Sequence, residues 1–324
     1  MLAVSARQNV PADAARRPFI DPAGRVDYAQ ATSGCGASAR TPVSSWTGCF
    51  LGETTMALAN ILVHLDSRPR TAARLGLSLR IAERCGARLT GMFAERAEAH
   101  AVGVVATWPS AHYVAARDKA QAAFAAATAP LKDRATFIDL NRGSDHEIVR
   151  RATEIARAFD LVVLGQAQDD VPVPAKLPDE VIAESGRPVL VVPYVGSYAD
   201  VGARPLFAWH SARGAARAAF DALPLLTSGC EAFIVEVGHE GDQRYEFSDL
   251  LVANLAGHKV KARYQYAVVD DISVSDALLS AISDHSADLM AIGAFDAGWR
   301  FLFGHGSGTP QILAHMTAPV LFSH

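Results

Sequence analysis

The sequence has no apolar run of 18 or more residues, so we expect no membrane-spanning helix and a protein that is soluble. It also has few cysteines, and the four show no C-x-x-C spacing: Cys35, Cys49, Cys85 and Cys230. This scarcity argues against a disulfide framework and favours free thiols in a reducing cytoplasm. Neither sign of charge dominates, because the net charge is -4 over 324 residues. We therefore expect no general attraction to nucleic acid or to an anionic membrane.

Several catalytic signatures are missing as well. The sequence contains no P-loop string G-x-x-x-x-G-K-[ST], no dinucleotide-binding glycine fingerprint after its first strand and no G-x-S-x-G nucleophile elbow. Its histidines show neither His-x-x-x-His nor His-Glu-x-x-His spacing, which disfavours a zinc site. We therefore expect a protein that is not an enzyme, with no catalytic residues and no metal ligands among its side chains.

Residues 1–55 show no apolar periodicity long enough to define a helix or a strand. They also lack the basic start and apolar core of a secretory signal. Two interpretations remain: a disordered extension, or a wrongly assigned start codon with Met56 as the true first residue. The second is favoured, because the segment cannot bury enough apolar surface to offset the entropy of ordering it.

From Met56 onward, short apolar runs alternate with helical patterns, which is typical of βαβ units and a parallel sheet covered by helices on both faces. The predicted strands are residues 61–65, 88–93, 135–140, 161–164, 189–192, 206–209, 232–237, 262–268, 289–292 and 320–322. The predicted helices are residues 71–84, 113–129, 145–159, 179–185, 214–226, 244–255, 275–285 and 310–315.

The second half of this pattern repeats the first. Asp160-Leu-Val-Val-Leu-Gly165 matches Asp288-Leu-Met-Ala-Ile-Gly293, and the R-P-V-L string at residues 187–190 matches A-P-V-L at 318–321. Internal similarity of this kind indicates a duplication. The sequence therefore predicts two tandem doubly wound α/β domains, at residues 57–195 and 203–324.

A proline precedes the last predicted strand of each domain, at Pro188 and Pro319, where a missing N–H group costs little. We expect these short final strands at sheet edges, and edge strands can pair with another edge. The prediction is an intramolecular pseudo-dimer or a homodimer formed through these edges.

These features resemble the universal stress protein family. The resemblance rests on D-L-x-x-x-G at the fourth strand, on the glycine-rich loop of the second repeat, and on the R-P-V-L and A-P-V-L strings. The stretch AWHSARGAAR at residues 208–217 is similar to the second repeat of bacterial tandem members. The resemblance covers about residues 57–324. It implies five-stranded sheets of strand order 3-2-1-4-5, and a stress-response role through ligand binding and an unnamed protein partner.

ATP-binding members of this family carry G-x2-G-x9-G-[S/T] after the fourth strand. Here Gly293, Gly306 and Ser307 match, and Asp296 replaces the second glycine. A carboxylate at that position would repel phosphate unless Mg²⁺ bridged the two, so the expected ligand is ATP with Mg²⁺.

The last helix is expected to contribute its N-terminus to the same site. Gly306, Ser307 and Gly308 would leave backbone N–H groups open to phosphate oxygens, and Thr309 is a good N-cap residue. His210 stands where the first strand of the family usually ends in Asp or Asn, and we expect it near the nucleoside.

The first repeat lacks such a loop. Asp66 ends its first strand as the family pattern requires, but no glycine-rich stretch follows Gly165, and Asp169 and Asp170 add negative charge. The sequence therefore predicts a first domain that binds no nucleotide. Two alternatives to an ATP-holding module remain: a slow ATP hydrolase that relies on Asp296, and a ligand-free scaffold for protein–protein interaction.

Overall fold

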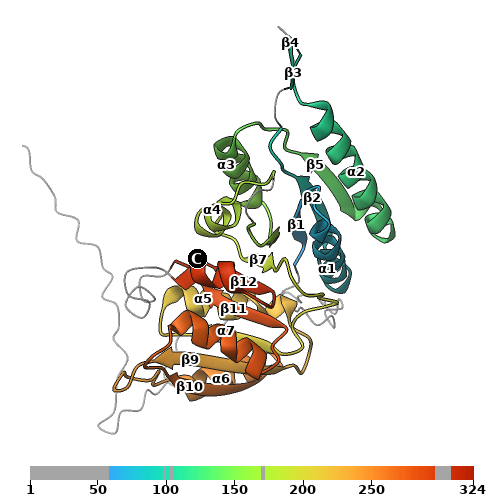
Figure 1. Ribbon diagram of the computed structural model, residues 1–324. Coiled ribbons are helices and arrows are strands. Elements are labelled where there is room, and N and C mark those ends of the chain that lie inside the picture. The colour runs from blue at the N-terminus through green and yellow to red at the C-terminus, as the bar shows by residue number, and fades with distance from the viewer. Residues whose placement is uncertain (1–57, 98–99, 103–104, 169–171, 296–307) are drawn as a thin grey trace, which may run out of the picture. The chain divides into compact units, whose positions relative to one another are not determined.

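The computed structural model describes residues 58–324 except 98–99, 103–104, 169–171 and 296–307 (Figure 1). The predictions about residues 1–55 therefore lie outside the described residues. Within the described part, no helix combines the length and the apolar character needed to cross a bilayer.

The described chain builds one large mixed sheet from two similar halves. The strands of the first half are β1 (Asn60–Leu65), β2 (Arg88–Phe93), β5 (Ala135–Asp139), β6 (Leu161–Gly165) and β7 (Val189–Val192). Those of the second half are β8 (Pro205–Trp209), β9 (Glu231–Gly238), β10 (Lys261–Val268), β11 (Leu289–Gly293) and β12 (Val320–Ser323). The order across the sheet is β10-β9-β8-β11-β12-β7-β6-β1-β2-β5. Each half therefore has the predicted strand order 3-2-1-4-5, and the predicted fold class is confirmed.

The last strands of the two halves, β7 and β12, join the sheet. They pair antiparallel, with Leu190 opposite Leu321, whereas the strands inside each half pair in parallel. Every residue of both strands is buried. The pairing lies within the chain, so the two edges that the sequence left unpartnered satisfy each other's backbone groups.

Helices cover both faces of the sheet (Figure 1). One face carries α1 (Arg70–Cys85), α2 (Ala111–Thr128), α5 (Arg213–Asp221) and α6 (Ser248–Gly257), and the other carries α3 (Asp145–Ala156), α4 (Leu177–Glu184), α7 (Val274–Asp284) and α9 (Gly308–His315). Two separate apolar cores result, one under each helix layer. This is the doubly wound arrangement that strands alternating with helices predict.

Short polar residues set the ends of several helices. The hydroxyls of Ser110, Ser144 and Ser273 accept backbone N–H groups in the first turns of α2, α3 and α7. Gly86 adopts the left-handed conformation that ends α1, with φ of 67°.

The structure differs from the sequence prediction in several elements, among them the helix predicted at residues 244–255, which spans Ser248–Gly257. The helix predicted at residues 214–226 ends at Asp221, and a 3-10 turn at Leu223–Leu225 follows, because Pro224 cannot continue an α-helix. A hairpin of β3 (His100–Val102) and β4 (Val105–Thr107) was not predicted.

The backbone packs tightly around Gly202, in the segment between β7 and β8. Its φ is 92°, and a Cβ atom there would lie 2.1 Å from the carbonyl oxygen of Leu225. Gly229 has a comparable φ of 76°, but a Cβ atom there would meet nothing within 4 Å.

This difference gives a matched prediction about stability. Gly229→Ala should lower the free energy of unfolding by about 1 kcal/mol, the cost of a left-handed alanine. Gly202→Ala carries the same strain and a backbone clash, so its loss should exceed that of Gly229→Ala by about 2 kcal/mol or more. Urea denaturation of both variants checks this, and equal losses would contradict the packing around Gly202.

Candidate functional site

The strand order of each half reverses between the carboxyl ends of its first and fourth strands. Open α/β sheets bind ligands at such a position, and we call it the crevice of that half. In the first half Asp66 follows β1 and Gly165 ends β6. In the second half His210 follows β8 and Gly293 ends β11. The registers of the two sheets make Asp66 and His210 equivalent positions.

In the first crevice the carboxylate of Asp66 is buried, with the residue only 3% exposed. Its Oδ2 lies 2.8 Å from Nη2 of Arg68 and 3.0 Å from Nη2 of Arg74. The hydroxyl of Thr71 donates to Oδ1. Burial opposes ionisation of Asp66, but the charges of Arg74 and its neighbours outweigh burial and hold the pKa of Asp66 well below its usual range. This buried carboxylate is therefore fully paired inside the protein.

Arg74 fills the space beside the fourth strand. Its Nε donates to the carbonyl oxygen of His64 at 2.7 Å, and a Cβ atom on Gly165 would lie 2.3 Å from its Nη1. Two cavities lined by described residues lie here, with volumes of about 10 Å³ each, which is room for about one water molecule. Asp169 and Asp170 lie outside the described residues.

The second crevice is built differently. His210 takes the place of Asp66, and Ala212 takes the place of Arg68. A Cβ atom on Gly293 would lie 2.5 Å from the carbonyl carbon of Gly214 and 2.6 Å from the backbone nitrogen of Ala215. The first turn of α5 therefore packs directly on the end of β11, and helix packing by itself requires the first glycine of the predicted motif.

Thr309 connects the start of α9 to the end of β11. It is 4% exposed, and its Oγ1 accepts the backbone N–H of Phe295 at 3.0 Å. The expected N-cap role of Thr309 is wrong, because α9 begins one residue earlier, at Gly308. Phe295 has φ of 51°, a left-handed conformation that is uncommon outside glycine. Because Phe295 lies beyond the end of β11, its backbone N–H group has no strand to pair with, and the hydroxyl oxygen of Thr309 accepts it instead.

This hydrogen bond joins Phe295, which directly precedes residues 296–307, to Thr309, the second residue after them. The remaining predicted site residues, Asp296, Gly306 and Ser307, lie outside the described residues.

Two buried polar atoms at the carboxyl ends of β8 and β12 have no hydrogen-bond partner among the described residues. They are Nε1 of Trp209 and Oγ of Ser323, and both side chains are almost completely buried. Buried donors without a partner are rare, and each such case needs an explanation such as a water or a ligand.

As for metals, the described residues contain no group of three His, Cys, Asp or Glu side chains that could hold an ion.

A polar and aromatic cluster that sequence reasoning missed lies beside the second crevice. The buried Glu236 accepts the hydroxyl of Tyr264 and the backbone N–H of Tyr245, the latter at 3.0 Å. Burial, together with Glu236, raises the pKa of the Tyr264 hydroxyl, which stays protonated as the donor. The ring of Tyr245 packs on Trp209 with 5.3 Å between centroids. No motif in the sequence marks these residues: β8, β9 and β10 bring Trp209, Glu236 and Tyr264 together, and the segment between β9 and α6 adds Tyr245.

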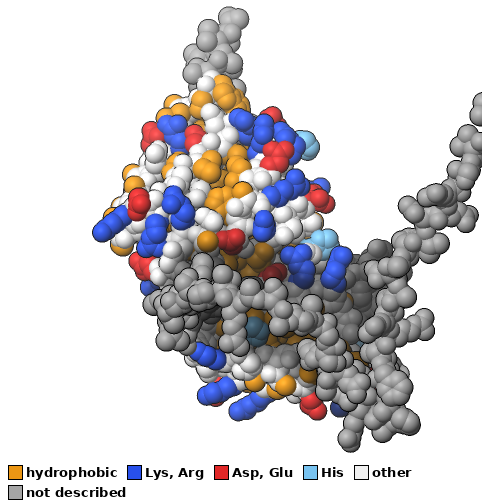
Figure 2. All heavy atoms as spheres, turned by 180° about the vertical axis from the view of Figure 1, so that it is seen from behind, with side chains coloured by type: hydrophobic (Ala, Val, Ile, Leu, Met, Phe, Trp, Pro, Cys, Tyr) orange, Lys and Arg blue, Asp and Glu red, His pale blue; other side chains and the backbone are white. Residues whose placement is uncertain are grey.

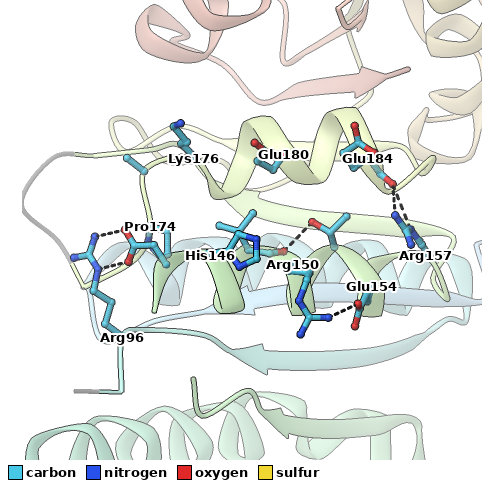
Figure 3. Close-up of a pocket in the computed structure, with 13 residues that line it drawn as sticks. Arg96, His146, Arg150, Glu154, Arg157, Pro174, Lys176, Glu180 and Glu184 are labelled. Atoms are coloured by element: carbon cyan, nitrogen blue, oxygen red, sulfur yellow. Dashed lines mark hydrogen bonds and ion pairs between the residues drawn. The ribbon is translucent and has the colours of Figure 1, made fainter. Parts of the chain in front are cut away.

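A larger groove, of about 780 Å³, lies between α3 and α4 of the first half (Figure 3). Its charged side chains balance, with Arg96, Arg150, Arg157 and Lys176 against Asp145, Glu154, Glu180 and Glu184. The contacts drawn in Figure 3 include the ion pair of Arg150 with Glu154, at 2.6 Å, and the hydrogen bonds from Arg157 to the carbonyl oxygen of Glu184. On the face that Figure 2 shows, basic and acidic side chains of the described residues are likewise interspersed. Neither surface therefore forms a basic patch that would attract phosphate from a distance.

The architecture is shared with solved structures of other proteins. A universal stress protein from Archaeoglobus fulgidus DSM 4304 superimposes with a TM-score of 0.61 at 16% sequence identity, over 82% of this chain and 95% of that chain. The fold is that of the universal stress proteins. A protein described as a universal stress protein, from Pseudomonas aeruginosa UCBPP-PA14, superimposes with a TM-score of 0.51 at 13% identity, over 82% of this chain and 93% of that chain.

Coverage of this extent includes both halves, so the tandem arrangement of the universal stress protein fold is matched within single chains. No protein-family model and no curated protein sequence matches the chain. The likeness at these identities establishes the fold, and the ligand has to be argued from the residues.

His64 lies next to Asp66 and makes the first half sensitive to acid. The side chain is fully buried, and its Nε2 lies 3.0 Å from the carbonyl oxygen of Ala94. Burial, followed by the charge of Arg74, lowers the pKa of His64 to about 4. The unfolded chain therefore binds this proton at a higher pH than the folded chain does.

Because the folded-state pKa is lowered from 6.5 to about 4, the stability that neutral His64 confers is complete above pH 6.5 and is lost as the pH falls toward 4. The free energy of unfolding should fall by roughly 1.4 kcal/mol per pH unit in this window. His64→Gln keeps a donor toward Ala94 but cannot titrate, so it should flatten this part of the profile. Urea denaturation between pH 4.5 and 7 checks this, with His112→Gln on the exposed surface of α2 as control. A wild-type slope in His64→Gln would contradict the assignment.

Proposed function

We propose that this chain is a tandem member of the universal stress protein family, with domains at residues 57–195 and 203–324, and that it acts in the cytoplasm as a stress-response module that binds ATP in its second domain. The fold, shared at low identity with universal stress proteins, and the residue matches of the second repeat support this proposal.

The observation that carries the proposal is the contact between Thr309 and Phe295. It holds the N-terminus of α9 beside the carboxyl end of β11. A helix N-terminus presents unpaired N–H groups and a positive dipole end, which stabilise phosphate oxygens. In this proposal Gly306, Ser307 and Gly308 leave those N–H groups accessible to the phosphates.

The contrast between the two crevices supports a single site. Arg74 and the Asp66 ion pairs occupy the first crevice, whereas His210 and Ala212 replace Asp66 and Arg68 in the second. In this proposal the imidazole of His210 hydrogen-bonds to the nucleoside or stacks on it. The buried donors of Trp209 and Ser323, which lack partners among the described residues, fit a polar ligand at the same edge of the sheet.

We propose that Mg²⁺ arrives with the nucleotide. The described residues contain no metal-binding cluster, and Asp296 is the carboxylate that would meet the phosphates. An ion shared between Asp296 and the phosphates would turn their repulsion into attraction. Phosphoryl transfer also needs a positioned base, and among the residues named for this site Asp296 alone carries a carboxylate. We therefore propose that the site binds ATP without turning it over.

Thr309→Val provides the test, because it removes the hydroxyl that accepts the Phe295 N–H group and keeps the side-chain volume. Leaving that amide without a partner should loosen the base of the loop and weaken ATP binding by roughly tenfold. Thr128→Val is the matched control, because that buried hydroxyl donates to the Phe124 carbonyl oxygen within the first half. Isothermal titration of the full chain with ATP, with and without Mg²⁺, measures both variants.

Two results would overturn this function. If the wild-type chain does not bind ATP at millimolar concentration, or if Thr309→Val binds it as tightly as wild type, the site is misplaced. If the chain releases phosphate above the buffer background and Asp296→Asn abolishes the release, the module is a slow ATP hydrolase instead.

A further inference from the structure

The side chain of Gln166, in the first half, forms hydrogen bonds with α9 of the second half. It directly follows β6 and is only 3% exposed. Its Nε2 donates to the carbonyl oxygens of Leu313 and Ala314 at 2.8 and 3.0 Å, and its Oε1 accepts the backbone N–H of Tyr194 at 3.1 Å. The last carbonyl groups of a helix have no partner within the helix. The side chain of Gln166 therefore caps the C-terminus of α9.

This contact has no counterpart in the opposite direction. Ala294 is the equivalent of Gln166, because both residues follow the matched D-L-x-x-x-G string. The backbone N–H of Gln166 donates to Val192, and that of Ala294 donates to Ser323 in the same way. Alanine has no side-chain donor, so Ala294 cannot cap α4 of the first half. The side chain at this position therefore caps α9 from the other half, whereas the equivalent side chain cannot cap α4 in the same way.

Both ends of α9 are fixed from outside the helix. Eight residues make a rod about 12 Å long. Thr309 ties its first turn to Phe295, and Gln166 ties its last turn to the first half. The hydroxyl of Tyr198, in the segment between the halves, lies 2.8 Å from the carbonyl oxygen of Thr317 just beyond the helix. Because the rod is short and stiff, a change at its C-terminal end is transmitted to the direction of its N-terminal end.

We propose that Gln166 is a positioning residue, through which the first half fixes α9 and thereby sets the orientation of the helix N-terminus in the second half. The consequence for ATP rests on the function proposed above, whereas the consequence for α9 does not require a nucleotide. In this proposal the side chain of Arg74 fills the crevice of the first repeat, and the function of that repeat is to hold α9 of the second repeat in position.

Hydrogen exchange of the nucleotide-free full chain tests whether the hydrogen bonds of Gln166 fix α9. Gln166→Ala introduces the residue that occupies the equivalent position, Ala294, so its fit in the fold has a precedent. Loss of the two hydrogen bonds should speed amide exchange across residues 308–316 by roughly tenfold, with exchange in β1 and β2 unchanged. Gln168→Ala is the matched control, because that side chain accepts a hydrogen bond from Arg68 within the first half.

A second variant separates the donors of Gln166 from its acceptor. Gln166→Glu keeps an oxygen for the Tyr194 N–H group but loses the N–H groups that face α9. It should therefore show the same faster exchange as Gln166→Ala. Wild-type exchange in Gln166→Glu would mean that only the contact with Tyr194 matters, and the proposal would fall.

Other outcomes are equally decisive. Unchanged exchange at residues 308–316 in Gln166→Ala, or an equal acceleration throughout the chain, would overturn the brace. If wild type binds ATP, Gln166→Ala should raise its dissociation constant by roughly tenfold, and an unchanged constant would overturn the positioning role. If wild type does not bind ATP, the proposed function fails, and the exchange data still decide whether Gln166 fixes α9.

Discussion

The antiparallel pairing of β7 with β12 is the constraint on which the rest of the structure depends. It merges two five-stranded sheets into one and sets the register between the halves, with Leu190 opposite Leu321. A shift by one residue would turn the buried side chains of either strand to the opposite face. Because this register is fixed, the end of β6 lies against the C-terminus of α9, and the contact made by Gln166 is possible.

The two halves place different residues at the equivalent position that follows their first strands. In the first, the buried Asp66 carboxylate finds its counter-charges inside the chain, and breaking such a pair would leave a charge that the interior cannot solvate. In the second, His210 replaces the carboxylate, and the backbone of α5 packs on Gly293. The two repeats therefore carry different chemistry at equivalent positions of the same fold.

Much of the fold could be predicted from the sequence, because apolar runs bounded by glycine and proline mark the βαβ units. The strand predicted at residues 88–93 coincides with β2, whereas the β3–β4 hairpin was missed because its strands are only three residues long. The site was harder to predict. Spacing marked Gly293 but could not show that α5 packs against it, and Arg74 stood out from no other arginine until the fold placed it beside Asp66. Gln166 belongs to no motif, and its role follows only from the way the halves meet.

The central claim is that the two repeats differ, with one crevice filled from within and the other able to take ATP. Native mass spectrometry of the full chain at increasing ATP and Mg²⁺ counts bound nucleotides directly. The account predicts one nucleotide per chain, with no second one at higher concentration. Two bound nucleotides would contradict the filled first crevice, and none would contradict the site at α9.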